Sequence, residues 1–384
     1  MMRIVIAGGG LSGVSLAAHL AVADHRRPVV VVDDGSRDLR SRTWASWTDR
    51  PGLLDAAACR WFDQVRVHLN GETKVVRLGA YRYRVVRGGD LADAVARLTN
   101  PLRHFTSLRG HVDRIERDGV IVDGEHVRAK WVFDSVIGPG SPPPADASLV
   151  FRGWHVRSER AAFDAETPTL FDFRTSQLNS ASFVYVLPFD AHHALVEHTA
   201  FTAPGAPESP SDQEEALAEY LTEVVRTGGH EVERAERAVL PLRAAQPVRA
   251  GGTVLRIGAE GGLLKASTGF AYQRIQRDSA AIADSLRRNG HPFDLPVTPA
   301  RFRTFDGTLL DVVTREPAQL ERAFGALFRR RTAEPALRFL DEESSVAGEW
   351  RLFAGMPAAP YLAAARRRLA HEGRTAPAEW GRPH

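Results

Sequence analysis

The stretch ALVEHTAF, residues 194–201, places one carboxyl group among apolar side chains. Side chains alternate along a β-strand, so Leu195, Glu197 and Thr199 would share one face, and His198 would lie on the other. Neither face is polar throughout, so the pattern predicts a strand that is buried on both sides. A buried carboxylate is costly and is relieved by a raised pKa or by a partner. Glu197 could therefore hold a proton, or it could pair with an arginine in a structural sheet.

A second set of residues has the spacing of a dinucleotide-binding turn. Gly8, Gly10 and Gly13 form a G-x-G-x-x-G pattern between the short apolar run RIVIA and a segment of helical periodicity, and Asp33 follows about 20 residues later. In such a turn the first glycine makes the tight bend, the second lets the backbone approach a pyrophosphate, and the third packs the helix on the strand. The phosphates would meet the helix N-terminus, and Asp33 would accept hydrogen bonds from ribose hydroxyls. The predicted nucleotide-binding residues are Gly8, Gly10, Leu11, Ser12, Gly13 and Asp33.

A late glycine-rich segment points to FAD rather than NAD. The sequence GAEGGLLKASTG, residues 258–269, follows a predicted strand and precedes a predicted helix at 270–288. A fingerprint at the N-terminus combined with a second glycine turn late in the chain resembles the FAD fold, in which that turn covers the flavin. The residues predicted to do so are Gly258, Gly261, Gly262, Thr268 and Gly269. Asp134 ends the strand WVFD and is either a further nucleotide-side residue or a turn-forming aspartate.

The elements between these motifs predict an α/β protein with several parts. VVVVDD reads as a parallel strand buried on both faces. Residues 151–201 read as antiparallel strands, with a hairpin turn at 188–191. The loop GPGSPPP, residues 138–144, is the expected crossing between domains. The predicted parts are an FAD-binding Rossmann-like domain with β-insertions, an antiparallel substrate domain, a return to the FAD domain and a helical C-terminal region, over residues 1–140, 150–250, 251–290 and 291–384.

Composition excludes several other classes of protein. Of the 384 residues, 43% are hydrophobic, as in an ordinary globular protein. The net charge of +3 permits contact with nucleic acid or anionic lipid but argues for neither, and no nucleic-acid partner is expected. The single cysteine, Cys59, rules out an intrachain disulfide and a zinc–thiolate cluster, and a cytoplasmic location fits. No signal peptide and no membrane-spanning run is expected. Because His193 and His198 would lie on opposite faces of one strand and His192 in the turn, no metal site is expected.

The chain resembles the lycopene cyclase family, particularly the actinobacterial β-cyclases related to the plant enzymes. The matching pieces run in family order from the N-terminal fingerprint through the C-terminal helices. They are GGGLSG, RTWASW, YRYRVVRGGDL, VFDS, FRGWHVR, LFDFRT, FVYVLPF, ALVEHT, RIGAEGG and STGF.

This resemblance implies a flavoprotein of the glutathione-reductase type that binds FAD and cyclises the linear ends of lycopene without net redox change. Reduced FAD, regenerated by NADPH, would be the active form. The resemblance places Glu197 at the position of the family's essential glutamate, as a general acid in an apolar site. The next position, acidic in many relatives, is His198 here. Trp44, Trp47 and Phe270 would lie beside the flavin or the polyene, and Arg42 could touch the FAD phosphates; without the resemblance, the two tryptophans could simply cap the core.

Three other functions stay open from the sequence. They are a cyclase that closes a different prenyl chain, a flavin monooxygenase, and a flavin-binding or lipid-binding protein without catalysis. The arginine runs at 329–331 and 366–368 lie in a predicted amphipathic C-terminal region. Because the expected substrate dissolves only in lipid, peripheral contact with the inner face of the cytoplasmic membrane is a further prediction.

Overall fold

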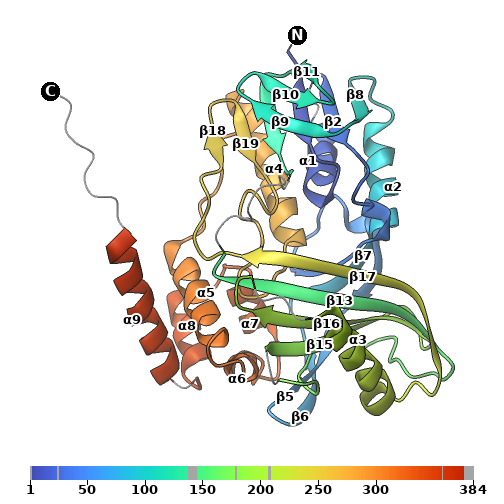
Figure 1. The fold of residues 1–384 in the computed structure, drawn as a ribbon, viewed down its shortest axis with the longest axis vertical. Coiled ribbons are helices and arrows are strands. Elements are labelled where there is room, and N and C mark those ends of the chain that lie inside the picture. The colour runs from blue at the N-terminus through green and yellow to red at the C-terminus, as the bar shows by residue number, and fades with distance from the viewer. Residues whose placement is uncertain are drawn as a thin grey trace.

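Three structural parts make up the computed structural model of the chain, shown in Figure 1. A parallel α/β part lies at the end that holds the N-terminus, a large sheet crosses the middle, and a group of helices forms the C-terminal part. The structure describes residues 2–23, 26–136, 145–177, 180–205, 209–356 and 358–375, with side chains to 368. The predicted interdomain loop at 138–144 lies outside these residues.

The α/β part confirms the predicted β-α-β unit. Its sheet has the order β18-β19-β12-β1-β2-β8, parallel except between β18 and β19. The bounds are β1 (Ile4–Ala7), β2 (Val29–Asp33), β8 (Phe105–Arg109), β12 (Trp131–Asp134), β18 (Ala250–Gly251) and β19 (Val254–Arg256). Because parallel strands are covered on both faces, they carry unbroken apolar runs such as VVVVD.

Helices cover one face of this sheet and a small sheet covers the other. Apolar side chains of α1 (Leu11–Val22) and α4 (Tyr272–Asn289) pack against β1. The other face packs against β10 of an antiparallel meander, where Val120 meets Val5 and Val32. The meander strands are β9 (Val112–Glu116), β10 (Gly119–Val122) and β11 (Glu125–Arg128), while α2 (Gly88–Thr99) packs beside α1. The two segments that supply the glycine turns, far apart in sequence, thus lie side by side.

The large sheet confirms the antiparallel strands predicted for 151–201. Its order is β17-β13-β16-β15-β14-β5-β6, with one parallel pair, β14 and β5. The bounds are β5 (Gln64–Leu69), β6 (Glu72–Arg77), β13 (Ala147–Ser158), β14 (Thr169–Asp172), β15 (Ala181–Pro188), β16 (His193–Thr202) and β17 (His230–Leu242). One face packs on α3 (Pro210–Glu219) and on a π-helical turn, Tyr220–Val225, through Val184, Val196 and Leu217.

The C-terminal helices complete the core on the far side of the large sheet. They are α5 (Ala300–Val313), α6 (Gln319–Leu327), α7 (Glu334–Leu340), α8 (Val346–Phe353) and α9 (Ala358–Thr375). Leu320, Phe324 and Leu327 of α6, with Phe328 just after it, are all buried and join one cluster with Phe171 of β14. Within the described residues, no helix combines the length and apolarity needed to cross a bilayer.

A further sheet, of three strands, joins the α/β part to the large sheet. Its order is β3-β7-β4, with β3 (Thr43–Thr48), β4 (Ala58–Phe62) and β7 (Arg82–Arg87). Strand β3 carries the RTWASW motif. Its Thr43 binds Glu236 of β17, and α4 packs close to it. This strand therefore sits where the nucleotide turn, the late glycine segment and the large sheet meet.

Candidate active site

A cavity of about 360 Å³ lies where the three parts meet. One end is formed by the N-terminus of α1, including Gly10 and Ser12, and the opposite wall by the large sheet, including Glu197. The walls between them are mainly apolar and aromatic. Aromatic and aliphatic lining comes from Trp44, Leu149, Phe151, Leu170, Phe171, Phe183, Leu240 and Phe270. One continuous space thus connects the predicted nucleotide turn to the predicted acid.

Glu197 lies in the middle of β16, as the alternating pattern predicted. Its residue is only 3% exposed, and Leu195, two residues before it on the same face, belongs to the main core cluster. The carboxyl group accepts a hydrogen bond from Thr199 Oγ1 at 3.4 Å and one from the hydroxyl of Tyr185. No arginine or lysine forms an ion pair with Glu197 among the described residues. The structural alternative, a carboxylate paired with an arginine, is therefore wrong within that part of the chain.

Burial raises the pKa of Glu197 from 4.5 to about 8. Desolvation is the main cause, because the apolar surroundings disfavour the charged carboxylate. The negative charge of Glu236 acts in the same direction, while the hydrogen bonds from Tyr185 and Thr199 favour the ionised form and oppose it. The carboxyl group is thus mostly protonated at neutral pH and can donate a proton into the cavity.

The register of the sheet places two carboxyl groups in one row. Glu236 of β17 pairs with Gly153 of β13, and Gly153 pairs with Glu197 of β16, which in turn pairs with Tyr185 of β15. Directly opposed residues share a face, so the side chains of Tyr185, Glu197 and Glu236 all project toward the cavity. Gly153 has no side chain, and a Cβ there would lie 3.0 Å from Glu197 Oε2 and 2.9 Å from Leu195 Cδ1.

Glu236 was missed in the sequence. It lies on an edge strand whose residues, HEVERAERAVLPL, alternate charged and apolar side chains, and such a pattern reads as solvent-exposed. The structure buries it to 5% exposure, because β3 covers this edge. The only signal that could have found it was its place in the row, and that needs the register of β17 against β13.

His198 lies on the opposite face of β16, as strand parity predicted. It is 3% exposed and contacts Gln213 of α3 at 3.5 Å, whereas Glu197 faces the cavity. Burial lowers the pKa of His198 to about 4, so its ring is neutral near pH 7. The histidine that replaces the second acidic residue of the family motif therefore does not line the cavity.

The N-terminal glycine turn has the geometry that its motif predicts. Gly8 has φ +101°, and a Cβ on Gly13 would lie 1.9 Å from the carbonyl oxygen of Gly8. At Gly10 no atom lies within 4 Å of such a Cβ, so open space meets the start of α1, where Leu11 and Ser12 line the cavity. These features fit a bound pyrophosphate on the helix N-terminus.

Asp33 binds the turn itself. Its carboxylate accepts from the amide of Gly9 at 2.6 Å and from that of Gly35 at 2.7 Å. These bonds fix the end of β2 beside the glycine turn, so a ribose would meet an Asp33 that is already oriented. The ribose contact itself stays a prediction.

The late glycine segment meets the N-terminal turn directly. Gly258 has φ +62°, and a Cβ there would lie 2.2 Å from Ser12 Oγ, so the two segments are in close contact. Thr268, Gly269 and Phe270 line the cavity. Gly261 and Gly262 do not line it, and instead pack against the backbone of Arg256 and the ring of Pro247. Asp134 also lies off the cavity, where its carboxyl group accepts from the amide of Val136 and burial raises its pKa.

The RTWASW strand separates into two environments. Trp44 and Arg42 line the cavity, and Arg42 also donates to the carbonyl oxygen of Arg237 at 2.9 Å. Trp47 does not reach the cavity. It is 4% exposed, its Nε1 donates to Asp341 at 2.8 Å, and its ring centroid lies 4.6 Å from that of Phe270. Trp47 therefore caps the core and supports Phe270 from behind.

Lys265 is committed to a buried ion pair rather than facing the flavin region. Its Nζ lies 2.8 Å from Asp306 and 3.0 Å from Glu342, and Arg274 pairs with Glu342 at 2.7 Å. These contacts tie the late glycine segment to the C-terminal helices. Neither cation lines the cavity.

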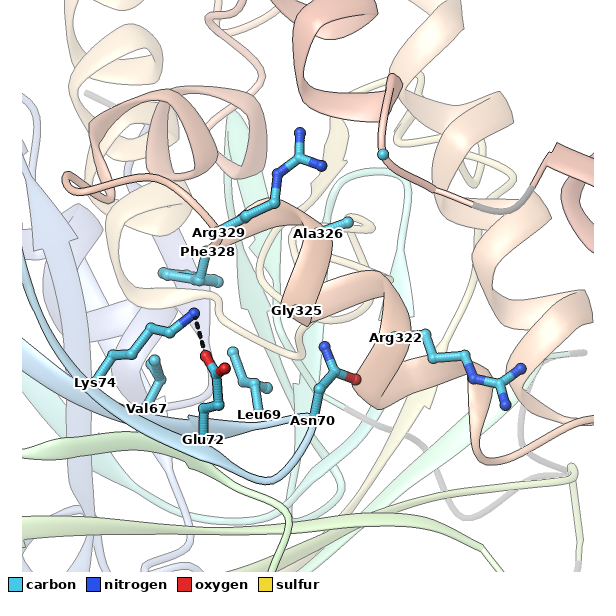
Figure 2. A pocket seen from close by; sticks show the side chains of 11 residues that line it. Val67, Leu69, Asn70, Glu72, Lys74, Arg322, Gly325, Ala326, Phe328 and Arg329 are labelled. Carbon is cyan, nitrogen blue, oxygen red and sulfur yellow. Dashed lines mark ion pairs between the residues drawn. The ribbon is translucent and has the colours of Figure 1, made fainter.

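A second cavity lies away from these residues. It measures about 400 Å³ and lies between the β5–β6 hairpin and α6, as Figure 2 shows. Lys74 and Glu72 point toward one another at 2.8 Å on its rim, and Arg322 and Arg329 line it as well. None of the predicted site residues lines this second cavity, so the first cavity is the candidate active site.

The fold and the two joined glycine turns define the class of fold, the Rossmann-type fold that flavoproteins share. The structure is similar to that of a flavoprotein/dehydrogenase from Cytophaga hutchinsonii, with a TM-score of 0.61 and 13% identity over 96% of this chain and 99% of that one. At this identity the similarity shows the fold alone. It confirms the fold class predicted from the sequence.

The sequence comparisons give the family. The lycopene cyclase protein family model matches residues 3–366, and the chain therefore belongs to the lycopene cyclase family. A lycopene beta-cyclase from a Paracoccus strain is 25% identical over 394 residues, 94% of this chain and 96% of that protein. A capsanthin/capsorubin synthase from Citrus sinensis is 23% identical over 310 residues, 74% of this chain and 59% of the plant protein. The chain thus spans about three fifths of the plant relative and nearly all of the bacterial one.

Proposed function

We propose that the chain is an FAD-dependent, redox-neutral carotenoid cyclase that converts the linear ψ-ends of lycopene into β-rings. The observation that carries this proposal is the buried carboxyl group of Glu197. It has a pKa of about 8 and lies on an apolar cavity that also reaches both glycine turns. Membership of the lycopene cyclase family and the name of the Paracoccus relative support the same substrate class.

The first chemical step is protonation of an alkene. Glu197 delivers its proton to the terminal double bond of the substrate, which leaves a carboxylate on the protein and a tertiary carbocation on the substrate. The neighbouring double bond attacks this cation and closes a six-membered ring. The new ring cation then loses a proton to give the cyclohexene, so no electrons are gained or lost overall.

The apolar walls have two tasks in this chemistry. Exclusion of water keeps Glu197 protonated and prevents water from trapping the cation. The faces of Trp44, Phe171, Phe183 and Phe270 offer negative π-density to a positive charge. Thr199 and Tyr185 hold the Glu197 side chain in place through their hydrogen bonds.

The glycine turns fit FAD. The amides at the start of α1 and the open space at Gly10 would hold the pyrophosphate, with Asp33 near the ribose and Thr268, Gly269 and Phe270 near the flavin ring. Arg42 lines the same cavity and could approach a phosphate. Reduced FAD, with NADPH as the electron donor, would supply negative charge that stabilises the cation.

The test is a comparison of pigments in cells that accumulate lycopene. Expression of the wild-type chain should give a product of unchanged mass and altered chromatographic retention, and Glu197→Gln should give none while retaining bound flavin. A product heavier by one oxygen atom would make the chain a monooxygenase instead. Conversion of another prenylated substrate but not of lycopene would mean that the chain is a cyclase with a different substrate. If flavin binds and no tested substrate reacts, the chain is a flavin-binding protein.

A membrane surface is the proposed partner of the C-terminal helices. Val346 and Trp350, one turn apart on α8, are 55% and 74% exposed, and Leu362 of α9 is 57% exposed. Arginines at 329–331 and 351 are exposed in the same part of the chain. Exposed apolar side chains beside arginines suit an anionic lipid surface, from which a lipid-soluble substrate could enter.

The chain should therefore sediment with anionic vesicles more than with neutral ones, and Trp350→Glu should weaken this binding. Equal binding to both kinds of vesicle would argue against the arginines taking part.

A further inference from the structure

Glu236 stands out as a buried titratable group that the first proton transfer does not use. It lines the same cavity as Glu197, from the other side of Gly153, and it is 5% exposed. Strands in a sheet lie about 4.8 Å apart, so the backbones of these two glutamates, with β13 between them, are roughly 10 Å apart. The missing side chain at Gly153 leaves room for Leu195 and the Glu197 carboxyl group to pack over β13, and both glutamates border the same cavity.

Glu236 has different partners from Glu197. Thr43 donates to it twice, from its amide at 3.0 Å and from its hydroxyl at 2.8 Å, and Arg234 donates at 3.1 Å. Among the described residues, the row thus holds one carboxyl group without a cationic partner and one that accepts from Arg234 and twice from Thr43. Two carboxyl groups in different environments are what a reaction with one proton donor and one proton acceptor needs.

A route for proton release lies behind Glu236. His155 Nε2 lies 2.5 Å from Glu236 Oε1 and 2.5 Å from Arg234 Nη2, and its ring stacks on that of Phe189 with centroids 5.9 Å apart. The side chains of His155 and Arg234 are 12% and 35% exposed, whereas that of Glu236 is 4% exposed. The three side chains therefore lead from the cavity wall toward solvent.

We propose that Glu236 is the catalytic base that removes the proton from the ring cation after Glu197 has started the cyclisation. This inference rests on the proposed function and deepens it. The Glu236 carboxylate takes a proton from the ring carbon where the new double bond forms, so the C–H bond breaks, its electron pair becomes the π-bond, and Glu236 becomes protonated. Glu236 then passes a proton through His155 to solvent, and Glu197 takes one up from water between turnovers. Protons and electrons balance over the cycle.

The position of the base decides which ring isomer forms. The ring cation can lose a proton from any of three neighbouring carbons, two in the ring and one methyl group, and each loss gives a different alkene. A carboxylate fixed on one side of the row selects one of these protons. Without it, the proton leaves to whatever acceptor is nearest, and a mixture results.

The test compares Glu236→Gln with Glu197→Gln and with a matched control, Glu231→Gln. Glu231 lies on the same strand but is exposed and pairs with Arg157 at 2.7 Å. All variants are purified with flavin, reduced, and supplied with lycopene in vesicles, and the ring isomers are separated by chromatography. We expect Glu236→Gln to slow ring formation by about 100-fold or more and to give a mixture of isomers. We expect Glu231→Gln to match the wild type and Glu197→Gln to give no ring.

A purely structural role of Glu236 predicts a different result. Glu236 also anchors β3, so its loss could lower stability and flavin content, but that alone would leave the isomer ratio of the residual activity unchanged. Glu236→Asp keeps the charge and is expected to restore the single isomer at a rate below that of the wild type. If Glu236→Gln fails to bind flavin, Glu236→Asp becomes the deciding variant. Ring formation by Glu236→Asp at the same rate as by Glu231→Gln would then overturn the proposal.

Failure of this inference is distinguishable from failure of the proposed function. If the wild-type chain forms no ring from lycopene, the proposed function fails. If the wild type forms one isomer, Glu197→Gln none, and Glu236→Gln the same isomer at the wild-type rate, only the role of Glu236 is wrong.

Discussion

Replacement of Glu197 by glutamine should change how the stability of the protein depends on pH. The folded protein holds this carboxyl group in its neutral form up to a pKa of about 8, whereas in the unfolded chain the pKa is close to 4.5. The stability that the protonated group contributes is fully present below pH 4.5 and is lost as the pH rises toward 8, because the unfolded chain gives up the proton first. Glutamine has a similar shape but does not ionise, so the stability of the variant should not fall in this way as the pH rises.

The size of the effect follows from the two pKa values. Each unit of pKa difference corresponds to about 1.4 kcal/mol, so the full difference between 4.5 and about 8 amounts to about 5 kcal/mol. Between pH 5 and pH 8 the free energy of unfolding of Glu197→Gln, relative to the wild type, should therefore rise by about 4 kcal/mol. His198 has the opposite sign, because its pKa is lowered to about 4 and its contribution is lost as the pH falls. Both proteins carry His198, so it cancels in the comparison.

The assay is urea unfolding at equal flavin occupancy, at several pH values from 5 to 9. The wild type and Glu197→Gln should diverge steadily up to about pH 8 and run parallel above it. Glu231→Gln serves as the control, because its exposed side chain should leave the pH profile of the wild type unchanged. A difference between wild type and Glu197→Gln that stays within about 1 kcal/mol across this range would falsify the protonated state assigned to Glu197, and with it the reason for calling it an acid.

Two further changes test the cofactor turn and the link to the C-terminal helices. Gly10→Val should abolish flavin absorbance after purification, because the valine side chain enters only the space for the pyrophosphate; the thermal midpoint of the flavin-free protein should not change. Gly13→Val should lower that midpoint itself, because the valine side chain clashes with Gly8. Normal flavin content in Gly10→Val would contradict the placement. Lys265→Met should cost about 3–5 kcal/mol in urea unfolding, because it leaves the buried Asp306 without its cation and removes one of the two cations that pair with Glu342. The exposed Lys74→Met should show no change, and equal effects of the two substitutions would argue against burial as the cause.

The parts of the site that the sequence could predict are those set by local pattern. The glycine turn at 8–13 was readable because a tight turn, a close helix and an apolar strand each demand a residue type at a fixed spacing. The burial of Glu197 followed from the lack of a polar face on its strand, and the opposite placement of His198 followed from strand parity; both are confirmed. The FAD contacts of the predicted residues and the domain bounds stay predictions.

The parts that could not be predicted depend on contacts between distant segments. Trp44 and Trp47 lie three residues apart, yet one lines the cavity and the other caps the core, because Asp341 and Phe270 cover the second ring. Lys265 was close to the right turn, but its partners, Asp306 and Glu342, come from the C-terminal part. Local spacing says nothing about which of several arginines or acids will meet such a side chain.

The row of Glu236, Gly153 and Glu197 shows why a sheet suits this chemistry better than a loop. A carbocation reacts with the nearest base, so the acid and the base must be held apart and in fixed positions throughout the reaction. Their separation is set by two strand spacings and their common face by the register. A shift of β17 by one residue against β13 would turn Glu236 to the other face. The pairing irregularity between His155 and Val156 comes after the row, so β13 keeps a continuous register against β17 from Ala147 to His155. The selectivity that we assign to Glu236 thus depends on backbone hydrogen bonds, which side-chain substitutions at the cavity wall leave in place.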